Sequence, residues 1–472
     1  MTIMKNKQLD PRFPWKIALG LYILSFGPQF LSARNLYWDD WYLLDPVTAK
    51  IADNHYSGSG RAPWSSFFES TVLNSSPFLF RVFTFIAFWA ATFFLFKILL
   101  KLEVLTRNQV NIVCLIFMLL PVNSARIALI TNAYSLSYLL FFLGWYLIAL
   151  QKSRVFQVFG LTCFFLSYTS IGLIPFTILP LIYMLIINKQ SSLRFTFRFW
   201  IDVSLLAAVP ILYLVSRHVF WPPIDGYKEM YTPQTLGLIR GILFVVICSI
   251  PGIYGIFIAK RCRSTISQYL VSAGLFSISV GAFPYMVGGH LVDISDWLIG
   301  FIPNFSDWNS RHQLLLPLGF ALIIGGSLKI EANGPLRWNT SPVLTTIIAI
   351  CVILNVTFAQ EYFLDGKKQD SIMAAMANNE DLKNASSILI DDQAVRFNAR
   401  GRLIRSYEWE AMLHRTFGDD TRKVSYLQYV DCTEFKPDAI LHISAPNGRL
   451  ESTLRANVAI NLWVEKINPC EN

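Results

Sequence analysis

The chain has little charge for its length. Of its 472 residues only 15% are Asp, Glu, Lys or Arg, whereas 54% are hydrophobic. About a quarter of the residues in a typical soluble domain are charged, so an ordinary soluble protein is not expected. Apolar runs long enough to cross a bilayer recur between Ile17 and Phe358 instead. The composition therefore predicts a protein embedded in a membrane.

Several common functional motifs are also missing. There is no Gly-rich loop for nucleotide phosphates and no dinucleotide-binding fingerprint, which argues against a soluble nucleotide as substrate. The seven cysteines show no metal-ligand spacing, so no metal site is predicted from them. The chain has no internal repeat of the kind that builds solenoids or many transporters.

Six of the seven cysteines fall into two groups, and Cys262 lies among basic residues of a connection predicted to be cytoplasmic. Cys432 and Cys470 lie in the C-terminal tail, where they could form a disulfide if the tail is outside the cytoplasm. Others lie in apolar runs, where we expect them to pack as small hydrophobic residues: Cys114, Cys163, Cys248 and Cys351.

The first apolar run lacks the cleavage site of a secretory signal. Basic residues precede Ile17 to Leu31, as in a signal peptide, but Arg34 to Asp45 is aromatic and charged rather than small. We therefore expect a retained first helix. In all, about eleven membrane-spanning helices are predicted: Trp15–Ser32, Phe78–Leu100, Val110–Val122, Ala133–Leu150, Val155–Tyr168, Ile171–Ile187, Trp200–Ser216, Leu236–Ala259, Tyr269–Val287, His312–Leu328 and Val343–Phe358.

The net charge of +9 reports orientation rather than a nucleic-acid partner. The basic residues gather in alternate connections, and such connections mark the cytoplasmic side of a membrane protein. The N-terminus is accordingly predicted inside and the C-terminus outside. The basic residues concerned are Lys5, Lys7, Arg12, Lys16, Lys97, Lys101, Arg107, Lys152, Arg154, Lys189, Arg194, Arg198, Lys260, Arg261, Arg263, Lys329 and Arg337.

Two parts of the chain are predicted. Residues 1–359 form the membrane domain, whose larger outer loops are 33–77 and 288–311. Residues 360–472 are richer in charge and are predicted to form a small α/β domain on the outer side. Its expected strands are Ser387–Ile390, Val424–Val430, Ala439–Ser444 and Val458–Val464, and its expected helices are Asp370–Lys383 and Tyr407–Arg415.

The sharpest local feature follows the first helix, in the run Tyr37-Trp38-Asp39-Asp40-Trp41. Two adjacent carboxylates at a membrane surface are costly unless they are solvated or used. Asp39 or Asp40 could act as a base that takes a proton from a hydroxyl, and Trp38 and Trp41 could stack on a sugar ring. A solvated interfacial turn within an aromatic belt is the alternative. Asp40, which lies further from the helix, is slightly favoured as the base.

Three arginines lie at outer helix ends: Arg81, Arg126 and Arg311. A guanidinium group binds phosphate through two parallel hydrogen bonds and stays charged in a low dielectric, so these residues are candidates for a phosphate clamp. Interfacial anchoring by a long basic side chain is the alternative for each.

Further acidic residues are weaker candidates. His290, Asp293 and Asp296, with Asp307 beyond them, could bind a divalent cation or an acceptor, although a solvated loop is favoured. Asp391-Asp392 follows a predicted strand and could bind a ligand, although a turn is favoured.

These features resemble the polytopic GT-C class of glycosyltransferases, which use polyprenyl- or dolichyl-phosphate sugars. In that class an acidic motif follows the first helix at once, as Asp39 and Asp40 do here. The chain is most similar to the branch with the tetratricopeptide-containing membrane O-mannosyltransferases and their bacterial relatives. Further similar elements are Pro121-Val122-Asn123, Phe141-Phe142-Leu143, and Arg311 before Leu316-Pro317-Leu318-Gly319.

The chain departs from that branch at two turns. Tyr168-Thr169-Ser170 stands where the relatives often have a Lys-Glu pair, and Ser124-Ala125-Arg126 replaces an expected acidic residue. No tetratricopeptide tail is present. These departures leave the acceptor class open.

The resemblance implies transfer of a sugar from a polyprenyl-phosphate donor to an envelope glycan, such as an O-antigen unit, or to a protein acceptor. It implies a multi-pass protein of the bacterial inner membrane, with lipid-linked sugar and membrane lipid as partners and no nucleic acid. The alternatives are an O-antigen polymerase or ligase, and a transporter or flippase for a lipid-linked glycan. The sequence leaves the sugar, the stereochemistry and the use of a divalent cation open.

Overall fold

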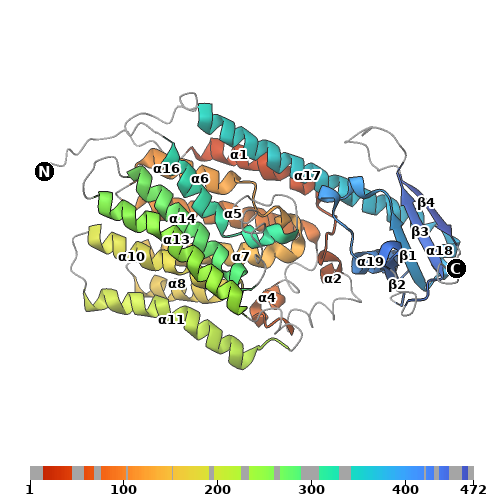
Figure 1. The fold of residues 1–472 in the computed structure, drawn as a ribbon, viewed down its shortest axis with the longest axis horizontal. Helices are drawn as coiled ribbons and strands as arrows, with labels where there is room; N and C mark the ends of the chain where they lie inside the picture. The colour runs from red at the N-terminus through yellow and green to blue at the C-terminus, as the bar shows by residue number, and fades with distance from the viewer. Residues whose placement is uncertain are drawn as a thin grey trace.

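The protein is a bundle of helices joined to a small mixed sheet, as a computed structural model shows (Figure 1). The structure describes residues 14–44, 58–68, 76–102, 105–150, 153–190, 196–224, 233–259, 266–288, 308–328, 342–418, 421–429, 435–445 and 460–465. In Figure 1 the bundle occupies one end of the molecule and the sheet the other, with the long helix α17 reaching from one to the other.

Helices account for most of the described chain, and each of the eleven predicted ranges contains one. The α-helices of the bundle are α1 (Trp15–Phe26), α2 (Asp40–Leu44), α4 (Pro63–Phe68), α5 (Pro77–Leu100), α6 (Arg107–Leu119), α7 (Asn132–Leu150), α8 (Arg154–Ser167), α9 (Leu173–Phe176), α10 (Ile178–Gln190), α11 (Phe197–Phe220), α13 (Thr235–Ala259), α14 (Ile266–Val287), α16 (Leu316–Ser327) and α17 (Pro342–Ala377). Short 3₁₀ helices are η1 (Gly27–Ser32), η3 (Ser124–Ile127), η4 (Leu129–Thr131) and η5 (Trp308–Gln313).

The character of a helical membrane protein is confirmed. Among the described residues, five helical stretches are long and apolar enough to cross a bilayer: Pro77–Leu100, Leu129–Leu150, Phe197–Phe220, Gln268–Val287 and Pro342–Ala377. Shorter apolar helices lie beside them. Large apolar side chains on the outside of the bundle, such as Val155 at 75% exposure and Phe197 at 82%, fit a lipid-facing surface.

Local sequence explains where several helices begin. Thr106 starts α6 with a capping box, because its hydroxyl accepts from Gln109 N while its own N–H donates to Gln109 Oε1. Thr196 caps α11 more simply, because its hydroxyl accepts from Phe199 N and no reciprocal bond is formed.

Small residues let two of these helices approach closely. Gly274 of α14 and Gly319 of α16 face each other, and a Cβ on Gly274 would lie 2.6 Å from the carbonyl oxygen of Gly319. Such contacts between backbones are typical of helix packing in membranes.

The helix α17 is much longer than a membrane is thick. Its 36 residues give a length of about 54 Å at 1.5 Å per residue, against a hydrocarbon core of about 30 Å. It runs unbroken through residue 360, where the composition changes, and ends at Ala377. Residues 370–377 of the predicted helix Asp370–Lys383 therefore belong to α17, and a separate short helix, α18 (Glu380–Asn384), follows.

The C-terminal sheet has four strands in the order β2-β1-β3-β4. β1 (Ser387–Asp392) pairs in parallel with β2 (Lys423–Tyr426) and β3 (Ala439–Ser444), and β4 (Asn461–Glu465) pairs antiparallel with β3. A helix is also confirmed near the prediction, α19 (Ser406–Phe417). A strand is confirmed within each predicted range, but the predicted strand Val424–Val430 is wrong beyond Tyr426, because Leu427–Tyr429 form a 3₁₀ helix. Ile388, Leu389 and Ile390 of the central strand are buried.

Candidate functional site

The loop after the first helix is anchored by Asp40. This carboxylate is fully buried, and it accepts hydrogen bonds from the backbone N–H groups of Tyr37 at 3.1 Å and Ile130 at 3.0 Å. Burial raises the pKa of Asp40 from 3.8 to about 7, although hydrogen bonds from Ile130 and Leu129 oppose this. Asp40 thus joins the loop to the short helix η4 and has no face open to a substrate.

Asp39 occupies a different environment from its neighbour. It is partly exposed, and its Oδ1 accepts a hydrogen bond from the Tyr407 hydroxyl at 2.6 Å. Among the described residues no other side chain or N–H group contacts the Asp39 carboxylate. Its Oδ2 forms no hydrogen bond with a described residue, whereas both oxygens of Asp40 are bonded to backbone N–H groups.

The tryptophans on either side of the pair are buried. Trp38 is 4% exposed and Trp41 is 2% exposed. Arg402 lies over the Trp38 ring at 5.1 Å, and Arg415 lies over the Trp41 ring at 5.9 Å. Both rings therefore contact the C-terminal domain, and their stacking on a sugar stays a prediction.

Arg81 holds the same loop from the start of α5. It donates from Nη1 to the carbonyl oxygen of Ala33 at 2.8 Å and from Nη2 to that of Asn35 at 2.7 Å. Its guanidinium also lies 5.9 Å from the Tyr37 ring centroid. Because both terminal nitrogens bind backbone, this side chain fixes the position of the loop, and its role toward phosphate stays a prediction.

Arg126 is buried, and none of the described carboxylates lies beside it. Its guanidinium carbon lies 3.4 Å from the centroid of Phe26 and 4.9 Å from that of Phe88. Within the described part of the chain its guanidinium forms no hydrogen bond or ion pair, although Arg126 is only 5% exposed. Burial lowers its pKa to about 10, so it stays charged at neutral pH. Stacking uses the faces of the guanidinium and leaves its N–H groups, which lie in the plane, for a ligand.

Arg311 lies close to this position in the fold. It belongs to η5, which packs against η3, the helix that carries Arg126. His312 beside it contacts the Tyr285 ring at 4.8 Å between centroids. The acidic loop, η3, η4 and η5 thus meet at one end of the bundle, although they are far apart in the sequence.

Two residues near this meeting point have left-handed backbone conformations. The φ angle of Trp38 is 52° and that of Asn123 is 58°. Asn adopts this conformation readily, but Trp does not, and the cost is about 1–3 kcal/mol. Trp38 keeps it because its backbone N–H donates to Glu408 Oε2 at 3.0 Å. Such strain is often found where side chains must be held for function.

The sequence did not suggest a buried charge network that lies beside the loop. Arg402 donates to Asp365 of α17 at 2.7 Å and to both Glu408 oxygens at 2.8 and 2.9 Å. Lys368 of the same helix donates to Asp392 at 2.6 Å and to Asn398 at 2.7 Å. Asp365 and Lys368 lie three residues apart, on one side of α17, and each pairs with a residue of the C-terminal part of the chain and not with the other.

The turn predicted for Asp391-Asp392 is wrong, because both residues belong to β1 and pair with β3, and both carboxylates are engaged. Asp392 pairs with Lys368, while Asp391 lies 2.8 Å from His442 Nδ1 on the neighbouring strand. His442 Nε2 lies 3.1 Å from Glu465, and the Trp463 ring stacks on the imidazole. These contacts account for Asp391-Asp392 without a ligand.

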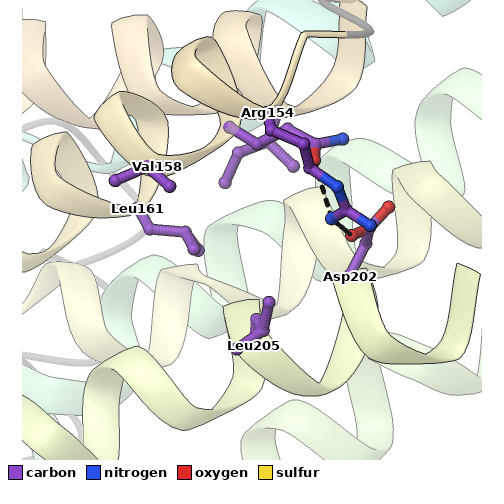
Figure 2. Close-up of a pocket in the computed structure, with 7 residues that line it drawn as sticks. Arg154, Val158, Leu161, Asp202 and Leu205 are labelled. Atoms are coloured by element: carbon purple, nitrogen blue, oxygen red, sulfur yellow. Dashed lines mark hydrogen bonds and ion pairs between the residues drawn. The ribbon is translucent and has the colours of Figure 1, made fainter. Parts of the chain in front are cut away.

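A small cavity lies elsewhere, between α8 and α11, and Figure 2 shows Arg154 reaching toward Asp202 beside it. Those two side chains form an ion pair at 3.0 Å. The cavity measures about 50 Å³, too small for a sugar. The residues that line it belong to α7, α8 and α11, and none belongs to the acidic loop, η3, η4 or η5. The cavity is therefore not part of the acidic site.

Some predicted residues lie outside the described part of the chain. They are His290, Asp293, Asp296, Asp307, Cys432 and Cys470. The four cysteines predicted to pack in apolar runs are buried, as expected. No cluster of ligands for a metal ion occurs among the described residues.

No protein-family model, curated protein or solved structure matches this chain.

Proposed function

We propose that this chain is a GT-C-type glycosyltransferase. It would move a sugar from a polyprenyl-phosphate donor to an envelope glycan or protein at the periplasmic face of the bacterial inner membrane. One observation carries the proposal: a partly exposed carboxylate, Asp39, occurs at the same end of a membrane helix bundle as Arg126, a buried cation that pairs with no carboxylate among the described residues.

Asp39 is assigned as the general base. In the reaction, the acceptor hydroxyl oxygen bonds to the anomeric carbon of the sugar, and the bond from that carbon to the phosphate oxygen breaks. Asp39 takes the hydroxyl proton, and the polyprenyl phosphate leaves with the bonding electron pair. The free Oδ2 of Asp39 supports this assignment over Asp40, whose two oxygens are buried and hydrogen-bonded to the backbone.

Arg126 is assigned to the phosphate. A lipid phosphate sits at the membrane surface, and its leaving requires positive charge nearby. Arg126 supplies a permanent charge that is not neutralised by a protein carboxylate within the described residues. Arg311 on the adjacent η5 is the second candidate for the clamp, and Arg81 supports the loop that carries the base.

The proposed topology follows from the basic loops. All eleven predicted helices cross the membrane, which leaves the N-terminus in the cytoplasm and the C-terminal domain in the periplasm. The acidic loop then faces the side on which polyprenyl-linked sugars are used. The excess length of α17 supports this, because its C-terminal part must extend beyond the bilayer.

The test is transfer by purified protein in detergent or nanodiscs. Radiolabelled undecaprenyl-phosphate sugars are supplied with candidate acceptors, and release of undecaprenyl phosphate is measured. We expect turnover in the wild type and a loss of about 10²–10⁴-fold in Asp39→Asn. The matched control is Asp370→Asn, which removes an exposed carboxylate of α17 whose pair among the described residues is with Lys367, at 3.7 Å.

The result also separates the alternatives. Movement of an intact lipid-linked glycan across proteoliposomes, without cleavage at the phosphate, would indicate a transporter. Transfer of a preassembled glycan from a diphosphate carrier would indicate a polymerase or ligase. Either outcome would contradict the proposal.

A further inference from the structure

Two consecutive residues of α19 hold two consecutive residues of the acidic loop. The Tyr407 hydroxyl donates to Asp39 Oδ1 at 2.6 Å. The Glu408 carboxylate accepts from the backbone N–H of Trp38 at 3.0 Å. The loop is thus hydrogen-bonded to the first turn of a helix in the C-terminal domain, about 370 residues further along the chain.

The α19 end of this contact is rigid. Glu408 is fully buried and accepts two hydrogen bonds from Arg402 and one from Arg405 N. Arg402 is bonded in turn to Asp365, which is also fully buried and also accepts from Ala399 N at 2.9 Å. A buried charge network of this kind holds one arrangement, because moving one member leaves the others unpaired in a low dielectric. These hydrogen bonds hold the first turn of α19, and with it Tyr407, in a fixed position against α17.

The loop end of the contact needs support. Trp38 has a strained backbone, and Asp39 is the residue that follows it. A carboxylate in a short exposed turn would sample several rotamers, and each would point its free oxygen differently. One hydrogen bond to Oδ1 and one to the preceding N–H fix both the side chain and the turn.

We infer that Tyr407 is a positioning residue for Asp39, so that the C-terminal domain completes the catalytic site of the membrane domain. The inference rests on the proposed function, since it assigns a partner to the proposed base. Tyr407 binds one carboxylate oxygen and leaves the other directed at the acceptor hydroxyl. Glu408 and Arg402 act through Trp38 and do not touch the acceptor.

The inference explains the burial of Trp38 against the C-terminal domain. Its ring contacts Tyr362 of α17 at 5.6 Å and Arg402 at 5.1 Å, which fills the space between the loop and the domain. The same packing would exclude water from the back of Asp39. A domain that only tethered the chain would not need to bind the proposed base directly.

The test compares Tyr407→Phe with Tyr426→Phe in the full-length protein. Both substitutions remove one hydroxyl from the C-terminal domain, but the Tyr426 hydroxyl accepts from Trp409 Nε1, another side chain of that domain, at 3.0 Å. We expect kcat to fall about 10- to 100-fold in Tyr407→Phe with an unchanged KM for the donor, because the base loses its orientation. Tyr426→Phe should keep the wild-type kcat.

A double-mutant cycle makes the test specific. Tyr407→Phe should have no further effect on kcat in an Asp39→Asn background, because the group that it orients is then absent. The melting temperatures of the same four proteins measure the contact independently of activity, and they should also be non-additive.

The outcomes separate the inference from the proposed function. If the wild type transfers sugar and Tyr407→Phe keeps full kcat, the positioning role is overturned while the transferase proposal stands. Additive effects of the two substitutions on kcat would overturn the role in the same way. If the wild type transfers no sugar from any donor, the proposed function fails, and the positioning role fails with it.

Discussion

The Asp40 carboxylate accepts a hydrogen bond from Ile130 N at 3.0 Å, across 90 residues of sequence. This contact joins the loop after the first helix to the short helices that precede α7. Because the carboxylate is fully buried, its ionisation is costly, and the pKa of Asp40 is raised from 3.8 to about 7. The residue next to the proposed base is therefore a structural anchor whose charge depends on pH.

The first prediction concerns that pH dependence. An acid with a raised pKa binds its proton more tightly in the folded protein than in the unfolded chain. The stability that Asp40 contributes should be complete below pH 3.8 and should be lost as the pH rises to about 7. We expect the melting temperature in detergent to fall less over this range in Asp40→Asn than in the wild type. An identical pH dependence in the two proteins would contradict the burial of Asp40.

The second prediction concerns Arg126. Arg126→Lys keeps the positive charge but loses the planar set of donors, so we expect the KM for the lipid-phosphate donor to rise about 10- to 100-fold. The control is Arg154→Lys at the start of α8, whose ion pair with Asp202 lies beside the small cavity. Arg311→Lys should also raise the KM for the lipid-phosphate donor. Unchanged donor binding in a stable Arg126→Ala protein would leave Arg126 as a packing residue.

The third prediction concerns the buried pair of Lys368 and Asp392. Lys368→Ala removes a cation that binds Asp392 at 2.6 Å and leaves this carboxylate buried without it. Breaking such a pair costs about 3–5 kcal/mol, so the midpoint of thermal or urea unfolding should fall clearly. Lys383→Ala is the matched control, because its pair with Glu380 is exposed and should matter little. Equal midpoints for the two variants would show that the network does not stabilise the C-terminal domain.

The fourth prediction concerns topology. The proposed orientation puts the C-terminal domain in the periplasm, so a phosphatase reporter fused after Asn472 should be active. A reporter that works only in the cytoplasm should be silent at the same site. The reverse pattern would place the acidic loop on the cytoplasmic side and would refute both the eleven-span topology and the proposed reaction.

The helical membrane character and the C-terminal strands could be predicted from the sequence, for a local physical reason. The hydrophobicity of its own residues is enough to predict a membrane span or a buried strand. Pro77–Leu100 and Ser387–Asp392 can therefore be recognised without knowledge of the residues that pack against them. The helix α17 was predicted to end near Phe358 because its apolar run ends there. The helix continues to Ala377 because the C-terminal domain buries Asp365 and Lys368 and supplies their partners. Asp365 pairs with Arg402, and Lys368 pairs with Asp392.

The different environments of Asp39 and Asp40 were decided only by the tertiary structure. As neighbours in sequence they have the same local composition, which slightly favoured Asp40 as the base. The fold buries Asp40 against Ile130, while it leaves one oxygen of Asp39 free and binds the other to Tyr407, 368 residues away. Such partners come from distant segments that meet only when the bundle and the sheet have packed. The identity of the accessible carboxylate is thus a property of that packing and is absent from the local sequence.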